Sequence, residues 1–478
     1  MSNHSNQLKR SLNFRDILIL AFSTMIGWGW VSLTGTWVWQ GGALGAAIAF
    51  GLGAVLCICV GLTYCELTPM LPYAGGELVF SYKAMGYHMS WLTGWMITFA
   101  YIGVAAWEGP ALATAIDYLV PIPRVGYLYT VAGFDVYLSW LIIPAVAGAI
   151  LIYINFRGIN VSAVFQAIVT AVLAAGGVIF AIVSVMKGDI ANAQPLVTGT
   201  SGVFTVVLAV PAMFVGFDVI PQAAEEMNLP VRKIPKAIIA SICLAAAWYI
   251  VMILSAAFAA PREVLSETGL TVANAISYAT SGTLAAKLII VTAIMGILTS
   301  WNGFIIGATR VLFSMGRAKM LPAIFGRTHP EYRTPFFSTL FVGVITIFTP
   351  LLGKNSLGWF VDASSFGTVT AYFMVALSFL ILRFRHPEME RPFVIRHGIP
   401  AGIAAVIIAA FFIALYLPIG PSSLTGVEWW IVLVWVITGA VFYLISLKDI
   451  RSNKEARDRA MYGNQIQQEG TQQYEKPE

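Results

Sequence analysis

The amino-acid sequence predicts an all-α polytopic membrane protein with about twelve transmembrane helices. Hydrophobic residues make up 58% of the 478 residues and charged residues only 11%, and the mean hydropathy is +0.79. Soluble globular domains carry about 25% charged residues. Apolar runs of about 20 residues, long enough to cross a bilayer as helices, recur along the chain. The sequence is therefore expected to form one helical bundle in a membrane.

The predicted helices are joined by short loops as far as residue 447. The tail 448–478 is rich in Gln, Asn, Glu and Lys and is predicted to be disordered in the cytoplasm. The twelve spans cover residues 14–40, 43–65, 90–119, 137–155, 161–186, 202–227, 236–260, 285–316, 335–352, 357–382, 399–418 and 428–447.

Positively charged residues predict the orientation of this bundle, because Lys and Arg accumulate in cytoplasmic loops. We expect a multi-pass protein of the cytoplasmic (inner) membrane with both termini in the cytoplasm. The net charge of +5 follows from this bias and needs no nucleic acid. With the N-terminus inside, 23 of the 28 Lys and Arg residues fall on the inner side and five on the outer side: Arg124, Lys187, Arg262, Lys287 and Lys354.

The first predicted span contains Met25-Ile26-Gly27-Trp28-Gly29, in which two glycines lie one residue apart. Glycine inside a helix costs roughly 0.5–1 kcal/mol relative to alanine, so this pair predicts that the helix stops and restarts here. Freed backbone groups in a membrane must face protein or a water-filled cavity, so broken membrane helices usually line binding sites. The alternative is that Gly27 and Gly29 only allow close helix packing.

A second interruption is predicted in the sixth span, where Phe214–Pro221 follows the apolar run Val203–Met213. Pro221 can open a new helix, because its missing N–H is not needed in a first turn. Paired interruptions in two halves of a chain point to a transporter site. Half-helices beginning after Gly29 and Asp218 would direct N–H groups at a carboxylate, and the opposite ends offer carbonyls to an ammonium group or a metal cation.

Four stretches resemble the amino acid–polyamine–organocation permeases. Gly216-Phe217-Asp218 with Ala224–Ile238 is similar to the sixth-helix signature of that superfamily, and Met25–Gly29 looks like its first-helix Met-Ile-Gly-Ser-Gly. Arg310–Pro322 resembles the end of its eighth helix, and Arg383–Phe393 resembles its loop after helix ten. The resemblance implies a LeuT-like transporter, whose first ten helices form two five-helix repeats inverted in the membrane. Broken helices 1 and 6 would hold an amino acid or amine.

The resemblance divides the chain into five parts: a cytoplasmic segment 1–13, a first repeat 14–186, a second inverted repeat 202–382, helices 11 and 12 in 399–447, and the tail 448–478.

The candidate substrate-binding residues come from the two breaks and the third span. Trp28 stands where the family pattern has serine; it would either narrow the pocket or pack against helix six or seven. Phe214 is a candidate to cover the ligand. The full set is Met25, Ile26, Gly27, Trp28, Gly29, Glu108, Phe214, Gly216, Phe217 and Asp218.

Glu108 lies in the third span and is followed by Gly109-Pro110. A carboxylate inside a membrane costs about 2.5–3.5 kcal/mol on insertion scales, so it is a functional candidate. Glu108 is expected to bind an amine or carry a proton; the alternative is a structural carboxylate that satisfies freed donors. Asp218 is expected either to join Glu108 in recognising amines or to be an ordinary helix N-cap.

A secondary active transporter explains these features best. A membrane enzyme would need a nucleophile with its base or a metal cluster, and the sequence shows neither, so we expect no enzyme activity. A channel or membrane solute sensor is the other class. Neutral amino acids are the first expected substrate, because the breaks suit a zwitterion, and amines or polyamines, carried by a permease or exchanger, are the second. No cofactor is expected, and neither the amino acid nor the oligomeric state can be assigned.

The driving ion is the least determined property. Many relatives carry a lysine on helix five after a Gln-to-Thr spacing, which Gln166 and Thr170 match here, but the next position is Leu173. Without that lysine, a sodium ion could bind the Met25 carbonyl and the hydroxyls of Thr299 and Ser300. Alternatively, those hydroxyls only bond their own helix. Proton coupling through Glu108 and uncoupled exchange remain open.

The charges at the predicted inner end of helix six are expected to be structural. Glu225 and Glu226 are expected to be solvated or to pair with the segment 10–15 as an inner gate. Glu77 follows Gly75-Gly76 in a predicted loop and carries no functional expectation.

Overall fold

The computed structural model describes residues 8–266, 269–418, 420, 423–450, 458 and 461–462. Among these residues, 10 helices are long and apolar enough to cross a membrane. Two shorter apolar stretches, Thr200–Met213 and Phe336–Leu352, occupy the sixth and ninth predicted spans. The structure therefore confirms an all-α polytopic bundle and accounts for each of the predicted spans.

The first half of the chain begins with a helix that is capped in full. The Asn13 side chain accepts hydrogen bonds from the N–H groups of Arg15 and Asp16, and the Asp16 carboxylate accepts one from the Asn13 N–H. This reciprocal box fixes where the first helix begins. The elements are α1 Phe14–Met25, α2 Gly29–Ser32, α3 Thr34–Gly41, α4 Ala43–Met70, α5 Glu77–Met85, α6 Tyr87–Leu119, β1 Tyr127–Val131, β2 Phe134–Tyr137, α7 Leu138–Arg157, α8 Ile159–Lys187 and the 3-10 helix η2 Ile190–Ala193.

The second half contains the second broken helix and the last three long spans. Its elements are α9 Thr200–Met213, α10 Val219–Gln222, η3 Ala224–Glu226, η4 Val231–Lys233, α11 Ile234–Ala259, α12 Arg262–Ser266, α13 Thr271–Thr280, α14 Thr283–Arg317, α15 Phe336–Phe348, η5 Thr349–Leu352, α16 Lys354–Arg385, α17 Gly398–Tyr416 and α18 Gly426–Ile450.

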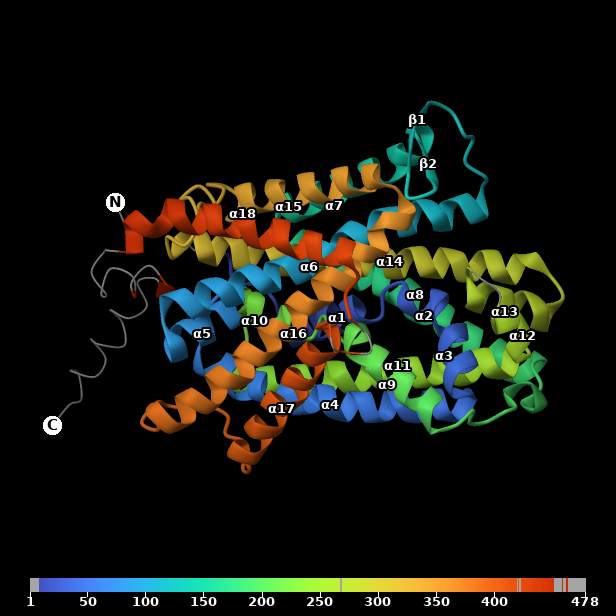
Figure 1. The fold of residues 1–478 in the computed structure, drawn as a ribbon, viewed down its shortest axis with the longest axis horizontal. Coiled ribbons are helices and arrows are strands. Elements are labelled where there is room, and N and C mark those ends of the chain that lie inside the picture. The colour runs from blue at the N-terminus through green and yellow to red at the C-terminus, as the bar shows by residue number, and fades with distance from the viewer. Residues whose placement is uncertain are drawn as a thin grey trace.

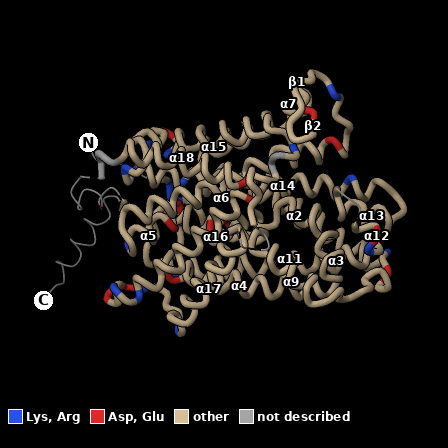
Figure 2. Tube along the Cα trace, viewed as in Figure 1, with Lys and Arg blue, Asp and Glu red and all other residues tan. Residues whose placement is uncertain are grey.

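The bundle is elongated, with the N-terminus and α5 at one end and the β1–β2 hairpin, α12 and α13 at the other (Figure 1). We call these the terminal end and the hairpin end. Charged residues gather toward the two ends and are sparse in between (Figure 2). Helices α6 and α14 form the centre of the bundle. In their most apolar 18-residue stretches, 83% and 78% of the residues are buried, compared with 17% in α18.

Most of the predicted disordered tail, 448–478, lies outside the described residues. Residues 448–450 continue helix α18, and three further described residues, Asp458, Met461 and Tyr462, lie against the terminal end. The Asp458 carboxylate accepts a hydrogen bond of 2.9 Å from the Tyr82 hydroxyl of α5. The Tyr462 ring lies 5.1 Å from that of Tyr73, and the Met461 carbonyl accepts from Arg317. This part of the tail is therefore packed on the bundle, contrary to the prediction.

Candidate functional site

The two broken helices meet in the middle of the bundle. Helix α1 ends at Met25 and α2 begins at Gly29, and α9 ends at Met213 before α10 begins at Val219. Gly216 has φ +136°, and a Cβ there would lie 3.0 Å from the Cγ and backbone N of Met25. Only glycine allows this conformation together with such a close approach. The break in α9–α10 therefore packs directly against the break in α1–α2.

The first break also lies against α14. A Cβ on Gly27 would be 2.6 Å from Ser300 Oγ, and a Cβ on Gly296 would be 2.6 Å from the Gly27 carbonyl oxygen. A Cβ on Gly29 would lie 2.9 Å from Met213 Sδ. The glycines therefore permit close helix packing, as the alternative expectation stated. This packing also places the backbone of the first break beside polar side chains of α14.

Backbone groups at the first break are only partly paired. The Met25 carbonyl accepts a hydrogen bond of 2.8 Å from the Tyr249 hydroxyl of α11. Within the described ranges, no acceptor is present for the N–H groups of Gly27, Trp28 and Gly29. Buried N–H groups are nearly always paired, so these three are available to an acceptor such as a carboxylate. Because α2 and α10 have only four residues each, a helix dipole contributes little here.

Glu108 of α6 lies next to this backbone. Its side chain is 3% exposed, and its Oε1 accepts a hydrogen bond from the Ser300 hydroxyl, the group that Gly27 faces. Its Oε2 is buried and has no hydrogen-bond partner in the described part of the chain. Tyr249, whose hydroxyl holds the Met25 carbonyl, interacts electrostatically with Glu108. One carboxylate oxygen is therefore unpaired beside the first break.

Asp218 has a different set of partners. Its Oδ1 accepts a hydrogen bond of 2.7 Å from the Gly216 N–H, and its Oδ2 accepts one of 2.8 Å from the Tyr101 hydroxyl. It makes no capping bond to α10, so the N-cap prediction is wrong. The carboxylate is turned back toward the break, where it fixes the loop that packs on Met25. Its hydrogen bonds do not join it to Glu108.

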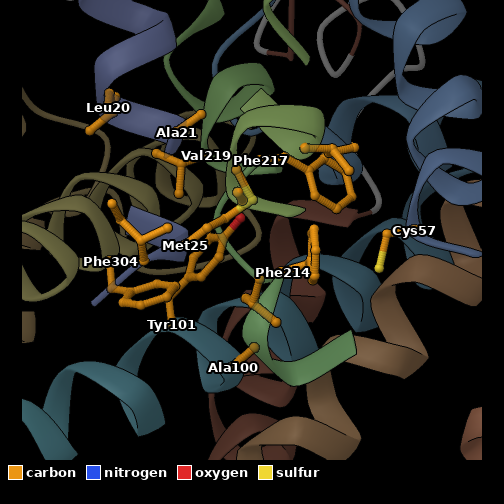
Figure 3. Close-up of a cluster of buried hydrophobic side chains, with 14 of the residues drawn as sticks. Leu20, Ala21, Met25, Cys57, Ala100, Tyr101, Phe214, Phe217, Val219 and Phe304 are labelled. Carbon is orange, nitrogen blue, oxygen red and sulfur yellow. The ribbon is translucent and has the colours of Figure 1, made fainter. Parts of the chain in front are cut away.

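Aromatic side chains enclose the junction. Phe214 and Phe217 are fully buried; the Phe214 ring lies 6.1 Å from Tyr249, and the Phe217 ring lies 5.4 Å from Tyr64. Figure 3 shows both with Met25, Tyr101 and Phe304 in one cluster drawn from α1, α6, α14 and the second break. Ile26 and Trp28 are buried in the same core, at 0% and 8% exposure. Whether Trp28 limits a pocket stays a prediction.

Comparison with known proteins assigns the chain to a family. A family model described as "Amino acid permease" matches residues 12–442. The chain belongs to this amino acid permease family. It therefore lies within the amino acid–polyamine–organocation superfamily that the four motifs predicted.

Curated relatives of this permease are transporters with several substrates. It is 27% identical to the methylthioribose transporter of Bacillus subtilis (strain 168), with 94% of this chain and 96% of that protein covered. It is 26% identical to the branched-chain amino acid permease BcaP of the same organism, covering 92% and 93%. It is 28% identical to human cationic amino acid transporter 4, covering 80% and 61%.

The predicted sodium ligands of the permease have protein partners. The Met25 carbonyl is bonded to Tyr249, and the Thr299 hydroxyl donates to the carbonyls of Ser23 and Gly296 at 3.2 and 2.9 Å. Ser300 donates to Glu108 and to its own helix at Gly296. Both hydroxyls therefore bond another helix as well as their own, so the expectation that they bond only their own helix is wrong; a sodium site stays a prediction.

The lysine position expected on helix five is Leu173, and an amide network lies upstream of it on α8. Gln166 Nε2 of α8 donates to Ser23 Oγ at 2.7 Å and to the Thr299 carbonyl at 3.0 Å, so it joins α1 to α14. Gln166 Oε1 accepts from Asn302 at 2.7 Å. The Thr170 hydroxyl donates to the Gln166 carbonyl at 2.6 Å, and Leu173 is fully buried.

Ion pairs at the terminal end of the permease join α14 to the turn after α10, and their partners differ from the predicted ones. Glu226 pairs with Arg310 of α14, with both side chains at most 1% exposed, and Glu225 pairs with Arg317. The segment before α1 contributes backbone instead, because the N–H groups of Ser11 and Leu12 donate to the Glu226 carbonyl at 2.8 and 2.9 Å. These arginines lie 84 and 92 residues from the glutamates, beyond what sequence spacing can indicate.

Proposed function

We propose that this permease is a secondary active transporter that moves a small neutral amino acid across the cytoplasmic membrane by alternating access. The observation that carries the proposal is the unpaired Glu108 Oε2, buried beside unpaired backbone N–H groups where the two broken helices meet. A buried carboxylate oxygen without a donor is costly, and an ammonium group would offset that cost.

The chemistry around the junction suits a zwitterion. The substrate ammonium would bind Glu108 Oε2, and its carboxylate would accept hydrogen bonds from the N–H groups of Gly27, Trp28 and Gly29. A single ionised carboxylate then balances a single ammonium. The family membership and the branched-chain permease among the relatives agree with an amino acid substrate.

Amines and polyamines are less well supported. A polyamine needs a second free acid, and Asp218, the candidate for that role, is already bonded to the Gly216 N–H and the Tyr101 hydroxyl. Because some relatives are named as cationic amino acid transporters, amines stay the second candidate substrate class. A substrate screen will distinguish amines from neutral amino acids.

The same proposal includes the arrangement in the membrane. Interruptions between α1 and α2 and between α9 and α10 lie in corresponding positions of the predicted repeats 14–186 and 202–382, which supports the inverted five-helix repeats. The terminal end is proposed to face the cytoplasm, because the loops assigned to it carry most of the Lys and Arg residues.

The test is saturable uptake into proteoliposomes of labelled alanine, leucine, arginine and putrescine. Glu108→Gln should raise the KM for the transported amino acid at least about tenfold, since a charge-assisted hydrogen bond contributes about 1.5–3 kcal/mol. Asp117→Asn, on the same helix but paired with Arg124 at the surface, is the matched control and should leave the KM unchanged.

Three outcomes would count against the proposal. An unchanged KM in Glu108→Gln would return that carboxylate to a structural role. Linear flux that never saturates with substrate would indicate a channel, and preferred uptake of putrescine would replace the amino acid by an amine.

A further inference from the structure

A second buried acid lies between the junction and the terminal end. Glu77, at the first residue of α5, is fully buried, and its Oε2 accepts a hydrogen bond from Gln222 Nε2 of α10. The same Nε2 lies 3.4 Å from the Tyr101 hydroxyl, which donates to Asp218. Four side chains from α5, α6, α10 and the second break thus form one polar cluster: Glu77, Gln222, Tyr101 and Asp218.

This cluster holds two carboxyl groups and no cation. Among the described residues, neither Glu77 nor Asp218 takes part in an ion pair. The groups that face Glu77 from α4, α6 and α16 are the phenols of Tyr64, Tyr101 and Tyr372. Arginines of the surrounding elements are paired with other acids: Arg310 with Glu226, Arg317 with Glu225 and Arg383 with Glu66.

Two uncompensated carboxylates in an apolar interior are strongly unfavourable, so such a pair retains a proton and titrates as a unit. Burial and the facing Asp218 carboxyl raise the pKa of Glu77 well above its ordinary value of 4.5. The Tyr64 hydroxyl interacts with the Glu77 carboxyl, and Glu77 Oε1 makes no other hydrogen bond within the described ranges, which leaves an atom that can carry that proton.

We propose that the cluster of Glu77, Gln222, Tyr101 and Asp218 is a proton-binding site that couples transport to a proton gradient. This inference rests on the proposed transport function and names its driving ion. In the closed state one carboxyl group of the pair is a neutral acid. Opening of the terminal end breaks its O–H bond, and the proton passes to water on that side.

The geometry links this proton to both the gate and the substrate. A Cβ on Gly76 would lie 2.8 Å from Pro221 Cβ, so α10 packs against the start of α5 and must part from it when the terminal end opens. Parting would admit water to Glu77. At the other end of the cluster, Asp218 holds the Gly216 N–H, and Gly216 packs on Met25 at the junction. A neutral acid accepts a hydrogen bond more weakly than a carboxylate, so a proton on Asp218 weakens its bond to the Gly216 N–H and thereby acts on the binding site.

The first measurement needs no substrate: thermal stability of purified protein against pH. Folded Glu77 has a raised pKa, so the folded protein keeps a proton that the unfolded chain releases. Stability is then full at low pH and is lost as pH rises through the folded pKa. The melting temperature of wild type should fall over this range, Glu77→Gln should flatten the profile, and Glu77→Asp should restore it. Glu331→Gln, an exposed acid, is the control.

The second measurement is transport in proteoliposomes, with the labelled amino acid that wild type takes up best. One co-transported proton makes a gradient of one pH unit worth about tenfold accumulation. Wild type and Glu331→Gln should show it with sodium replaced by choline. Glu77→Gln should lose this accumulation but keep counterflow exchange, which needs no proton movement.

Several results would overturn the proton site: accumulation by Glu77→Gln driven by the pH gradient, an absolute requirement for sodium in wild type, or identical melting profiles of wild type and Glu77→Gln. If wild type takes up none of the tested solutes, the proposed function fails. The melting profiles still decide whether the cluster binds a proton.

Discussion

Gly27 combines an unpaired backbone N–H with contact to α14, and a side chain at this position would disrupt both. Its added Cβ would come within 2.6 Å of Ser300 Oγ, the hydroxyl that bonds Glu108. The neighbouring Ser300 cannot move away without releasing the carboxylate. Overpacking of this kind costs about 1–3 kcal/mol, and here the strain falls on the proposed binding groups.

We therefore expect Gly27→Leu to insert and fold but to lose saturable uptake at least about tenfold, as an equilibrium penalty above 1.4 kcal/mol implies. Gly51→Leu in α4 is the matched control, since a Cβ there meets nothing within 4 Å. Uptake and size-exclusion behaviour of both variants are the measurements. Wild-type uptake by Gly27→Leu would show that its backbone does not approach the substrate.

Local signals in the sequence located the breaks but not the partners of the acids. Gly27, Gly29 and Pro221 have backbone preferences that can be read from the sequence. The structure interrupts both helices next to these residues. The partners of Asp218 and Glu77 are Tyr101 and Gln222, 117 and 145 residues away in the chain. The sequence predicts a loop at Glu77, because a nine-residue helix with one acid gives a weak periodic pattern. A glutamate directly after two glycines was the available signal.

The short part of the second broken helix, α10 with the turn η3, is stabilised by an ion pair to α14 more than by its own backbone hydrogen bonds. Helix α10 has four residues, and the turn η3 that follows it carries Glu226, which Arg310 of α14 binds through two nitrogens at 2.8 and 3.0 Å. Removing one member of a buried pair leaves the other charge uncompensated, which costs about 3–5 kcal/mol. This pair therefore stabilises the closed terminal end.

Arg310→Met should lower the melting temperature of the purified permease strongly, as a loss of about 3–5 kcal/mol requires. Arg124→Met removes an exposed ion pair with Asp117 and should cost about 0–1 kcal/mol. The double variant Arg310→Met/Glu226→Leu should recover much of the loss, because no buried charge remains unpaired. Equal melting temperatures of the two single variants would mean that the Arg310 pair is not a structural lock.

Hydropathy predicted the long helices well because a bilayer demands about 20 apolar residues from each of them. It could not predict the short elements. The hairpin β1–β2 has strands of five and four residues, of which β1 is mostly exposed, and α12 has five residues. Such elements depend on contacts at the helix ends, for example the Tyr129 hydroxyl on the Leu351 carbonyl, and not on a periodic pattern.

The orientation predicted for the permease in the membrane follows from the even number of spans and from the distribution of Lys and Arg residues. The segment before α1 and the described tail residues both lie at the terminal end, where Leu12 and Met227 form a parallel bridge and Tyr462 lies beside Tyr73 (Figure 1). The hairpin end carries the five Lys and Arg residues predicted to be outside. Insertion with the terminal end in the cytoplasm agrees with this asymmetry.

Cysteine labelling in intact cells tests this orientation. Leu128→Cys lies in the exposed β1 strand at the hairpin end, and Glu331→Cys lies in an exposed loop before α15. Both would be made in a Cys243→Ser background, because Cys243 is the one native cysteine in the exposed class. A membrane-impermeant maleimide should label Leu128→Cys in cells and Glu331→Cys only in inverted vesicles. The background protein should give little signal in either. Labelling of Glu331→Cys in intact cells, with Leu128→Cys protected, would reverse the proposed orientation and place the proton-release side of the cluster outside the cell.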